Sequence, residues 1–151
     1  MTIAAQDANR MRRPGPAHIA PVPPEWPWEH DMPPAPAVRA GRTVYLSGQL
    51  ALDAQGRLVG KGDLQAQARQ CFDNIEAILA RVGGRMHDIV KMTSYFTCQL
   101  DARSSQDYWA VRRDVFGGYK PASTGVQVQA LLLPDCLLEI EAIAVLPEPA
   151  P

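Results

Sequence analysis

Glu139 and Glu141 are the only charged residues in the apolar run from Leu137 to Val145. A carboxylate with apolar neighbours loses part of its hydration, so its pKa is expected to rise. A carboxyl group with a raised pKa can take up and return a proton near neutral pH, which is general acid–base chemistry. A glutamate in this run can therefore transfer protons, and for Glu139 a hydrogen-bond role at a subunit interface is the alternative.

Metal chemistry has little support in the sequence. The cysteines are an odd set without short ligand spacing, and the histidines form no His-x-x-x-His or Glu-x-x-His pair. These residues are Cys71, Cys98, Cys136, His18, His30 and His87. We expect buried or idle thiols, no disulfide framework, no metal and no cofactor.

Length and charge limit the class of protein. The chain has 151 residues, of which 46% are hydrophobic, and this fits one compact domain. Its 15 Lys and Arg residues nearly balance 16 Asp and Glu residues without a basic run, which disfavours nucleic acid and anionic membranes as partners. No apolar stretch reaches the roughly 20 residues that span a bilayer, and no hydrophobic signal core is present near the start. We expect a cytoplasmic protein that binds a small molecule.

Residues 1–35 are dense in proline, which cannot build a helix interior or donate hydrogen bonds within a sheet. We expect an irregular arm there, an ordered domain over residues 36–146 that begins near Ala37, and a short tail over residues 147–151. Trp26 and Trp28 lie in the arm, and such large rings need a surface to pack against. That surface is the domain itself or a neighbouring subunit, or else the rings line a substrate pocket.

Strand signals surround two helical patterns. We expect strands at residues 38–39, 43–47, 58–59, 88–97, 124–129 (half-buried) and 137–145. Asp63 is the expected N-cap of a long helix ended by Gly83-Gly84, and Ser104 or Ser105 caps a second helix ended by Gly117-Gly118. The residues predicted to be buried are Leu64, Ala68, Cys71, Phe72, Ile75, Ile78, Leu79 and Val82 in the first helix, and Tyr108, Val111 and Val115 in the second.

This order of elements predicts an α+β domain with one mixed sheet and two helices on a single face. Two helices cannot cover both faces of such a sheet. We therefore expect the open face to be buried in an oligomer.

Six segments occur in an order that resembles the RidA (YjgF) family over residues 36–145. They are Ala37 to Gly41, Val44 to Gln49, Gly62-Asp63, Asn74 to Leu79, Lys120 to Ala122 and Glu139 to Ala144. The resemblance implies a chorismate-mutase-like fold, a homotrimer and three pockets at subunit interfaces. It also implies an activity, because deaminases of this family hydrolyse 2-imino or 2-enamino acids without a cofactor or a metal.

Hydrolysis of a C=N bond needs an anchor for the substrate carboxylate, a group that moves protons and a positioned water. In the deaminases an arginine directly after Lys-Pro-Ala or its equivalent binds the carboxylate. Here Ser123 occupies that place and Thr124 follows it, so both are substrate-binding candidates. One neutral hydrogen bond would replace two charge-assisted ones, and carboxylate affinity at this point is expected to fall by a few kcal/mol.

Other positions match the family pocket or depart from it. Glu139 matches the glutamate that holds the attacking water, and Ser47 and Gly48 match a pocket wall, with a strand-end turn as the alternative role of Gly48. Residues 33–35 stand where the family resemblance implies an aromatic–serine pair at the rim of the pocket. Trp109 falls where deaminases often carry asparagine, and it either stacks on a ligand ring or fills space.

Arg112 and Arg113 follow Trp109 by three and four positions on the second helix. Either can turn toward the pocket and restore a positive charge from another wall, and exposure to solvent is the alternative. If one of them does so, a carboxylate ligand is again favoured.

Two functions fit these residues. The first is a cofactor-independent enzyme that hydrolyses or tautomerises an imine or enamine of a small metabolite, aromatic and cyclic ones included, with Glu139 moving protons. The second is a non-catalytic trimer that binds a small metabolite or docks on a partner in a regulatory role. Replacing Glu139 with glutamine separates them. RNA cleavage, a third function, lacks the basic groove it would need.

Overall fold

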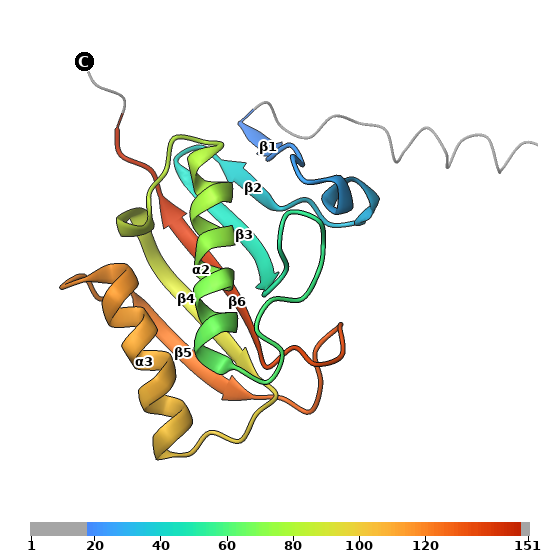
Figure 1. The fold of residues 1–151 in the computed structure, drawn as a ribbon. Helices are drawn as coiled ribbons and strands as arrows, with labels where there is room; N and C mark the ends of the chain where they lie inside the picture. Colours follow the sequence, from blue (N-terminus) through green and yellow to red (C-terminus); the bar gives the residue numbers. More distant parts are fainter. Residues whose placement is uncertain (1–17, 149–151) are drawn as a thin grey trace, which may run out of the picture.

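The computed structural model describes residues 18–148, and these form the α+β fold that the sequence predicts (Figure 1). Six strands in this part of the chain make one mixed sheet, and two long helices lie side by side on one of its faces. The elements are β1 (Ile19–Pro21), η1 (Pro27–Asp31), β2 (Ala37–Ala40), β3 (Thr43–Leu50), α2 (Leu64–Ala80), η2 (Met86–Asp88), β4 (Ile89–Phe96), α3 (Ala102–Phe116), β5 (Ala122–Gln127) and β6 (Leu138–Val145).

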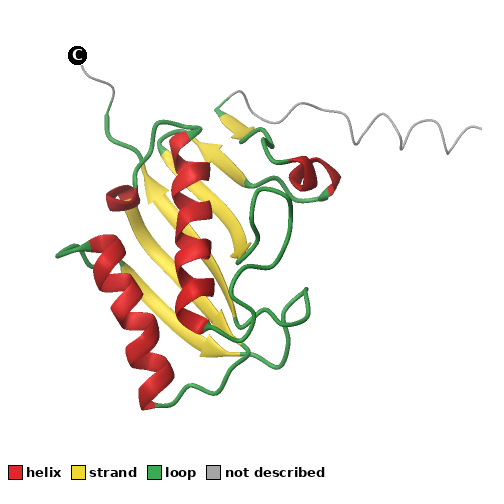
Figure 2. Ribbon diagram, in the orientation of Figure 1, coloured by secondary structure: helices red, strands yellow, loops and turns green. Residues whose placement is uncertain are grey.

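The sheet has the strand order β1-β2-β3-β6-β4-β5, in which only β4 and β5 are parallel to each other. A parallel pair needs a crossover, and α3 provides it, so this helix covers the β4–β5 edge of the sheet (Figure 2). The last strand, β6, is inserted between β3 and β4. Residues from the final segment therefore lie at the centre of the sheet.

Helix α2 follows its predicted boundaries and supplies much of the core. The Asp63 carboxylate accepts a hydrogen bond from the Ala66 amide at 3.0 Å, which confirms the N-cap. Every predicted residue of the apolar stripe is buried except Val82, which is partly buried at the end of the helix. Gly83 follows with φ of 76°, a left-handed conformation that suits glycine.

Helix α3 begins earlier than predicted, and neither Ser104 nor Ser105 is its N-cap. The Asp101 carboxylate accepts from the Ser104 amide at 2.8 Å, while the Ser104 hydroxyl accepts from the Asp101 amide at 2.9 Å. This reciprocal capping box satisfies two donors at the helix start, which explains why Asp101 takes the cap position. Tyr108 and Val111 are buried as predicted, whereas Val115 is only partly buried.

Three strand predictions need correction. The segment 58–59 forms no strand, only an isolated bridge between Leu52 and Leu58. β5 is exposed along its whole length in the single chain and not half-buried, because it lies at the edge of the sheet. Regular structure also begins before Ala37, since the proline-rich segment contributes η1 and the edge strand β1, where a missing amide donor is tolerated.

The sheet face opposite the helices is open in the single chain, as predicted. Side chains alternate along β6, so that Glu139, Glu141 and Ile143 are half-buried on the open face and their neighbours lie under the helices. Tyr45 on β3 is 50% exposed on the same face. A face with this much apolar surface favours burial against another molecule.

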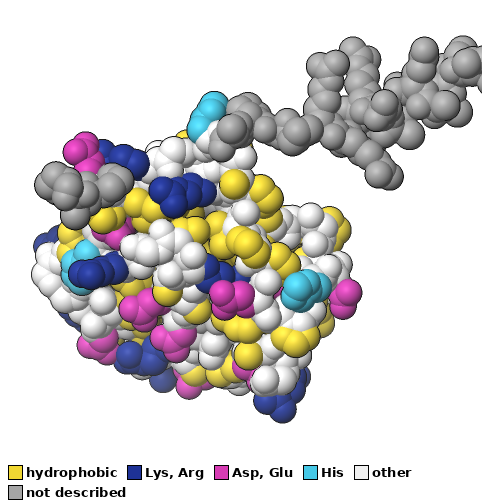
Figure 3. Space-filling view, turned by 90° about the horizontal axis from the view of Figure 1, so that it is seen from above, with side chains coloured by type: hydrophobic (Ala, Val, Ile, Leu, Met, Phe, Trp, Pro, Cys, Tyr) yellow, Lys and Arg dark blue, Asp and Glu magenta, His cyan; other side chains and the backbone are white. Residues whose placement is uncertain are grey.

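Charged groups of both signs are interspersed on the surface that Figure 3 shows, with hydrophobic patches between them. Among the described residues, no helix has the length and apolar character that crossing a membrane requires.

Candidate functional site

Strand β3 has a bulge at Ser47 and Gly48. The register of β3 against β6 shifts between Leu46 and Gln49, so Ser47 and Gly48 together lie opposite a single β6 residue. A side-chain carbon added to Gly48 would overlap with the carboxylate of Glu139. Glycine at this position therefore allows the Glu139 carboxylate to lie directly against the β3 backbone.

Glu139 has the environment expected of an acid–base group. Within residues 18–148 its carboxylate accepts no hydrogen bond, although it is half-buried. Burial raises the pKa of Glu139, and the nearby Glu141 carboxylate raises it further, as the sequence predicts. Glu141 itself accepts a hydrogen bond from the Tyr95 hydroxyl at 2.9 Å. The geometry therefore leaves Glu139, rather than Glu141, available to a ligand.

Ser47 connects this strand to the segment before it. Its hydroxyl donates to the Ala35 carbonyl at 2.7 Å, and its amide donates to the Pro36 carbonyl at 3.0 Å. The hydroxyl hydrogen is thus already used within the chain. Ser47 fixes the wall beside Gly48, and its oxygen still has capacity to accept a hydrogen bond.

A second group of predicted residues lines a cavity of about 340 Å³ between α3 and β5. Trp109, Arg112 and Ser123 all contribute to it. The full lining is Ser94, Phe96, Leu100, Ser105, Tyr108, Trp109, Arg112, Ser123 and Gly125. Trp109 is 49% exposed, so its ring does not simply fill space in the single chain.

Arg112 turns toward Ser123. Its Nη1 donates to the Ser123 hydroxyl at 2.8 Å, and its guanidinium carbon lies 5.9 Å from the centre of the Tyr108 ring. None of the ion pairs formed within residues 18–148 involves Arg112. Arg113 is exposed and lies outside this cavity. A positive charge therefore lies beside position 123, on the Arg112 side chain from α3.

Tyr108 and Ser94 are cavity residues that the sequence did not identify as such. Their hydroxyl groups share a buried hydrogen bond of 2.6 Å. Burial also raises the pKa of Tyr108, so the phenol stays protonated. The signal in the sequence was the tyrosine hydroxyl in an apolar helix stripe, because such a group needs a polar partner when buried.

The two groups of candidate residues lie on opposite faces of the sheet. In the sheet Ser123 lies beside Met92, whose side chain is buried under the helices. Glu139 lies beside Tyr95. Side chains alternate between the two faces along β4, so Tyr95 and Glu139 are on the open face. Thr124 joins neither group, since its hydroxyl accepts from Lys91 at 2.6 Å on the open face. One chain therefore brings together Ser47, Gly48 and Glu139 on one side, and Trp109, Arg112 and Ser123 on the other.

The described residues offer no metal site. No three His, Cys, Asp or Glu side chains in residues 18–148 are close enough together to hold a metal ion. Burial raises the pKa of the Cys71 thiol well above its ordinary value, so this cysteine is a poor nucleophile and a poor ligand.

Known proteins are similar to this chain in sequence and in fold. Residues 33–146 match the family described as Endoribonuclease L-PSP. The chain is 37% identical over 108 residues to a RutC family protein of Pyrococcus horikoshii, which covers 72% of this chain and 82% of that protein. It is 35% identical over 112 residues to the 3-aminoacrylate deaminase RutC of Acinetobacter baylyi, with 72% and 83% covered.

Solved structures agree with the sequence relatives. The crystal structure of RidA from the Antarctic bacterium Psychrobacter sp. matches with a TM-score of 0.68 at 34% identity, covering 76% of this chain and 89% of that one. The family match over residues 33–146 includes the strands that carry Gly48, Ser123 and Glu139. The chain belongs to the RidA (YjgF) family, as its motifs predict.

Proposed function

We propose that this protein is a cofactor-independent enzyme that hydrolyses the imine or enamine group of a small metabolite bearing a carboxylate. The observation that carries the proposal is the Arg112 guanidinium, hydrogen-bonded to Ser123 in the α3–β5 cavity and without an ion-pair partner in the described chain. A relative with 35% identity is named a 3-aminoacrylate deaminase, and 3-aminoacrylate carries both an enamine and a carboxylate.

Arg112 can bind a carboxylate while it keeps its contact with Ser123. A guanidinium has five N–H donors, and the hydrogen bond to Ser123 uses one of them. Charge-assisted hydrogen bonds contribute about 1.5–3 kcal/mol each, which makes a two-point contact with a carboxylate strong enough to orient a small substrate. The exposed ring of Trp109 provides an apolar wall beside it.

A homotrimer would complete the site. Within one chain Glu139 and Arg112 lie on opposite faces of the sheet, so they cannot act on one substrate. Two features support a partner copy: the open sheet face near Glu139 and the fully exposed edge strand β5 near Ser123. In the proposed trimer, the α3–β5 cavity of one copy faces Gly48 and Glu139 of the next.

Glu139 would move the protons of the reaction. It accepts a proton from water as the water oxygen attacks the C=N carbon, and a tetrahedral carbinolamine forms. It then returns this proton to the nitrogen. A second transfer through Glu139 carries the hydroxyl proton of the carbinolamine to the amino group, which leaves as ammonia while the carbon becomes a carbonyl group. An enamine substrate is first protonated on carbon to give the imine. The raised pKa of Glu139 suits both uptake and return of the proton.

Hydrolysis of freshly generated 2-imino acids tests this function. We expect the natural protein to accelerate it, and Arg112→Gln to lower kcat/KM by about 10²-fold because the carboxylate loses its charged partner. Arg113→Gln is the matched control, since it removes the same charge one position along the helix but outside the cavity. Equal losses in the two variants, or no turnover by the natural protein, would contradict the proposal.

A non-catalytic metabolite-binding protein is the second candidate. One observation favours it: the cavity with Arg112, Ser123 and Trp109 is formed within a single chain and does not include Glu139. Such a protein would not hydrolyse imines. Its Glu139→Gln variant would bind carboxylates with the same affinity as the natural protein. Loss of turnover with retained binding in this variant would exclude the second candidate.

A further inference from the structure

Two buried hydroxyl groups line the α3–β5 cavity and are hydrogen-bonded to each other. The oxygens of Ser94 and Tyr108 lie 2.6 Å apart, and the two residues are only 1% and 5% exposed. Two hydroxyl groups have two hydrogens, and the bond between them uses one. Neither hydroxyl has another partner within residues 18–148. Because a buried donor normally has an acceptor, the second hydrogen needs one inside the cavity.

The other polar side chains at this cavity leave further hydrogens without an acceptor. The Ser123 hydroxyl accepts from Arg112, and in the described chain it donates to no group. Arg112 uses one of its five N–H donors in that contact. No carboxylate or imidazole of residues 18–148 lines the cavity. The cavity therefore combines several free donors with one positive charge, an arrangement that suits an anion.

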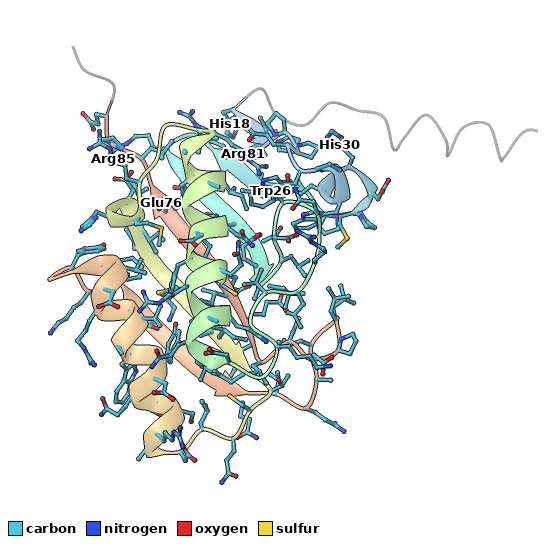
Figure 4. The ribbon with its side chains drawn as sticks, viewed as in Figure 1. His18, Trp26, His30, Glu76, Arg81 and Arg85 are labelled. Carbon is cyan, nitrogen blue, oxygen red and sulfur yellow. The ribbon has the colours of Figure 1, made fainter. Side chains whose placement is uncertain are left out.

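A buried arginine elsewhere in the chain has its anion within the fold. The Arg81 side chain is 5% exposed, and its Nη1 lies 2.9 Å from the Glu29 carboxylate. Arg81 also lies beside Trp26, with its guanidinium carbon 4.8 Å from the ring centre, so this ring packs on the domain itself (Figure 4). Arg112 has no such carboxylate among the described residues. The anion that would balance its charge therefore comes from outside this part of the chain.

The Tyr108 ring is held from both sides, which fixes the position of its hydroxyl. It meets the Phe96 ring edge-on with centres 5.0 Å apart, and it stacks on the Phe72 ring with centres 6.3 Å apart. The guanidinium carbon of Arg112 lies 5.9 Å from the Tyr108 ring centre. Both groups border the same cavity, so the two oxygens of one carboxylate can contact both of them.

We propose that the Tyr108 hydroxyl donates a hydrogen bond to the ligand anion that Arg112 binds, and that Ser94 positions this hydroxyl by donating to it. A phenol is more acidic than a serine hydroxyl, so it is the better donor to an anion. The two hydrogen bonds then run in one direction and strengthen each other. The proposal rests on the proposed function, which assigns a carboxylate to this cavity.

Binding of pyruvate tests the role of Tyr108 without requiring turnover. We would measure its affinity for the natural protein and for Tyr108→Phe by calorimetry. The variant keeps the ring and loses only the hydroxyl. Since a hydrogen bond to a charged group is lost, we expect the affinity to fall about 10-fold or more. Melting curves would show that the variant is folded.

Tyr119→Phe is the matched control. The Tyr119 hydroxyl donates an equally short hydrogen bond of 2.6 Å to the Ile89 carbonyl, but it does not line the α3–β5 cavity. The same chemical group is therefore removed from a different place near α3. This variant should keep the pyruvate affinity of the natural protein.

Ser94→Ala tests the positioning role of Ser94. It should weaken pyruvate binding less than Tyr108→Phe does, because the phenol remains. In the Tyr108→Phe background the same change should have no further effect, since Ser94 acts through Tyr108. Losses that simply add in the double variant would overturn the positioning role.

A spectroscopic measurement locates the anion in the natural protein itself. Tyrosine labelled with carbon-13 at Cζ gives one signal for each of the four tyrosines in the chain. The two phenylalanine variants identify the signals of Tyr108 and Tyr119. Pyruvate should shift the Tyr108 signal until binding saturates and leave the Tyr119 signal unchanged. A purely structural role of the Tyr108 hydroxyl predicts no shift.

The outcomes separate this proposal from the proposed function. A pyruvate affinity that depends on Tyr108, with the matching shift, supports the hydroxyl donor even if no imine is hydrolysed, in which case only the proposed function fails. Imine hydrolysis that depends on Arg112, with equal pyruvate affinity in the natural protein and in folded Tyr108→Phe, would overturn the hydroxyl donor alone. Equal losses in the two tyrosine variants, or no pyruvate binding by the natural protein, would also overturn it.

Discussion

At the scale of single residues, we propose that Arg112 and Ser123 share the task that one arginine performs in the deaminases which this chain resembles. Ser123 on β5 has no charge, but it positions the Arg112 guanidinium through a 2.8 Å hydrogen bond. Gly48 has a comparable supporting role for Glu139, because any larger residue would displace the carboxylate. The candidate chemistry thus depends on pairs of residues from different elements.

Glu139→Gln is predicted to lower imine turnover by about 10²–10⁴-fold, the usual contribution of a positioned acid–base group. Because only the ionised carboxylate accepts a proton, the activity of the natural protein should fall as pH drops below the raised pKa of Glu139. A pH–rate profile checks both points. Unchanged turnover in the glutamine variant would contradict the role of Glu139.

The same variant has a predicted effect on stability. The folded state raises the pKa of Glu139, so it binds the proton more tightly than the unfolded state does. Proton binding by Glu139 therefore stabilises the folded state of the natural protein, and this stabilisation should be lost as pH rises through the raised pKa. Glutamine does not titrate, so the Glu139→Gln variant should show no such loss. The Tm of Glu139→Gln minus that of the natural protein should increase between about pH 4 and pH 8. A difference that is constant or decreases with pH would contradict the pKa shift.

The sequence identified most of the candidate residues but not their partners. The apolar neighbours of Glu139 were enough to predict its raised pKa. The choice between Arg112 and Arg113 stayed open, because the direction of a long side chain depends on which group across the cavity accepts its hydrogen bond. The need for glycine at position 48 could not be predicted from the sequence either, because it follows from the register of β3 against β6.

At the scale of elements, α2 is the clearest link between sequence and structure. Its three- and four-residue apolar spacing predicted the buried stripe, and Ile75, Ile78 and Leu79 are fully buried. The predicted start of α3 was wrong because Asp101, Ser104 and Ser105 are all residue types that favour the N-cap position. Only the reciprocal hydrogen bonds in the structure show that Asp101 occupies it. β1 was missed because its pairing with β2 spans a long, proline-rich segment.

Ile75→Ala should destabilise the protein by about 2–5 kcal/mol, because it leaves a cavity under the sheet. Val82→Ala, at the partly buried end of the same stripe, is the matched control and should cost less. Denaturant unfolding measures both free energies. A loss below about 1 kcal/mol for Ile75→Ala would mean that this face of α2 is not the packed one.

At the scale of the whole molecule, the single chain carries two separate groups of candidate residues, which we propose are halves of one site. Arg112 on α3 and Ser123 on β5 lie on the helix-bearing side of the sheet near one edge, and Gly48 and Glu139 lie on the open face. The exposed β5 edge and the open face both favour contact with further copies. The proposed homotrimer explains these features together, and it places one active site at each of its interfaces.

Subunit mixing tests this central claim most directly. Arg112→Gln and Glu139→Gln proteins, each predicted to lose most of its activity alone, would be unfolded together in equal amounts, refolded and assayed for imine hydrolysis. In random trimers three quarters of the assemblies contain one interface with both native residues, so we expect about a quarter of the natural activity to return. If assemblies shown to contain both variants stay as inactive as either variant alone, the site is not shared between copies and the claim is wrong.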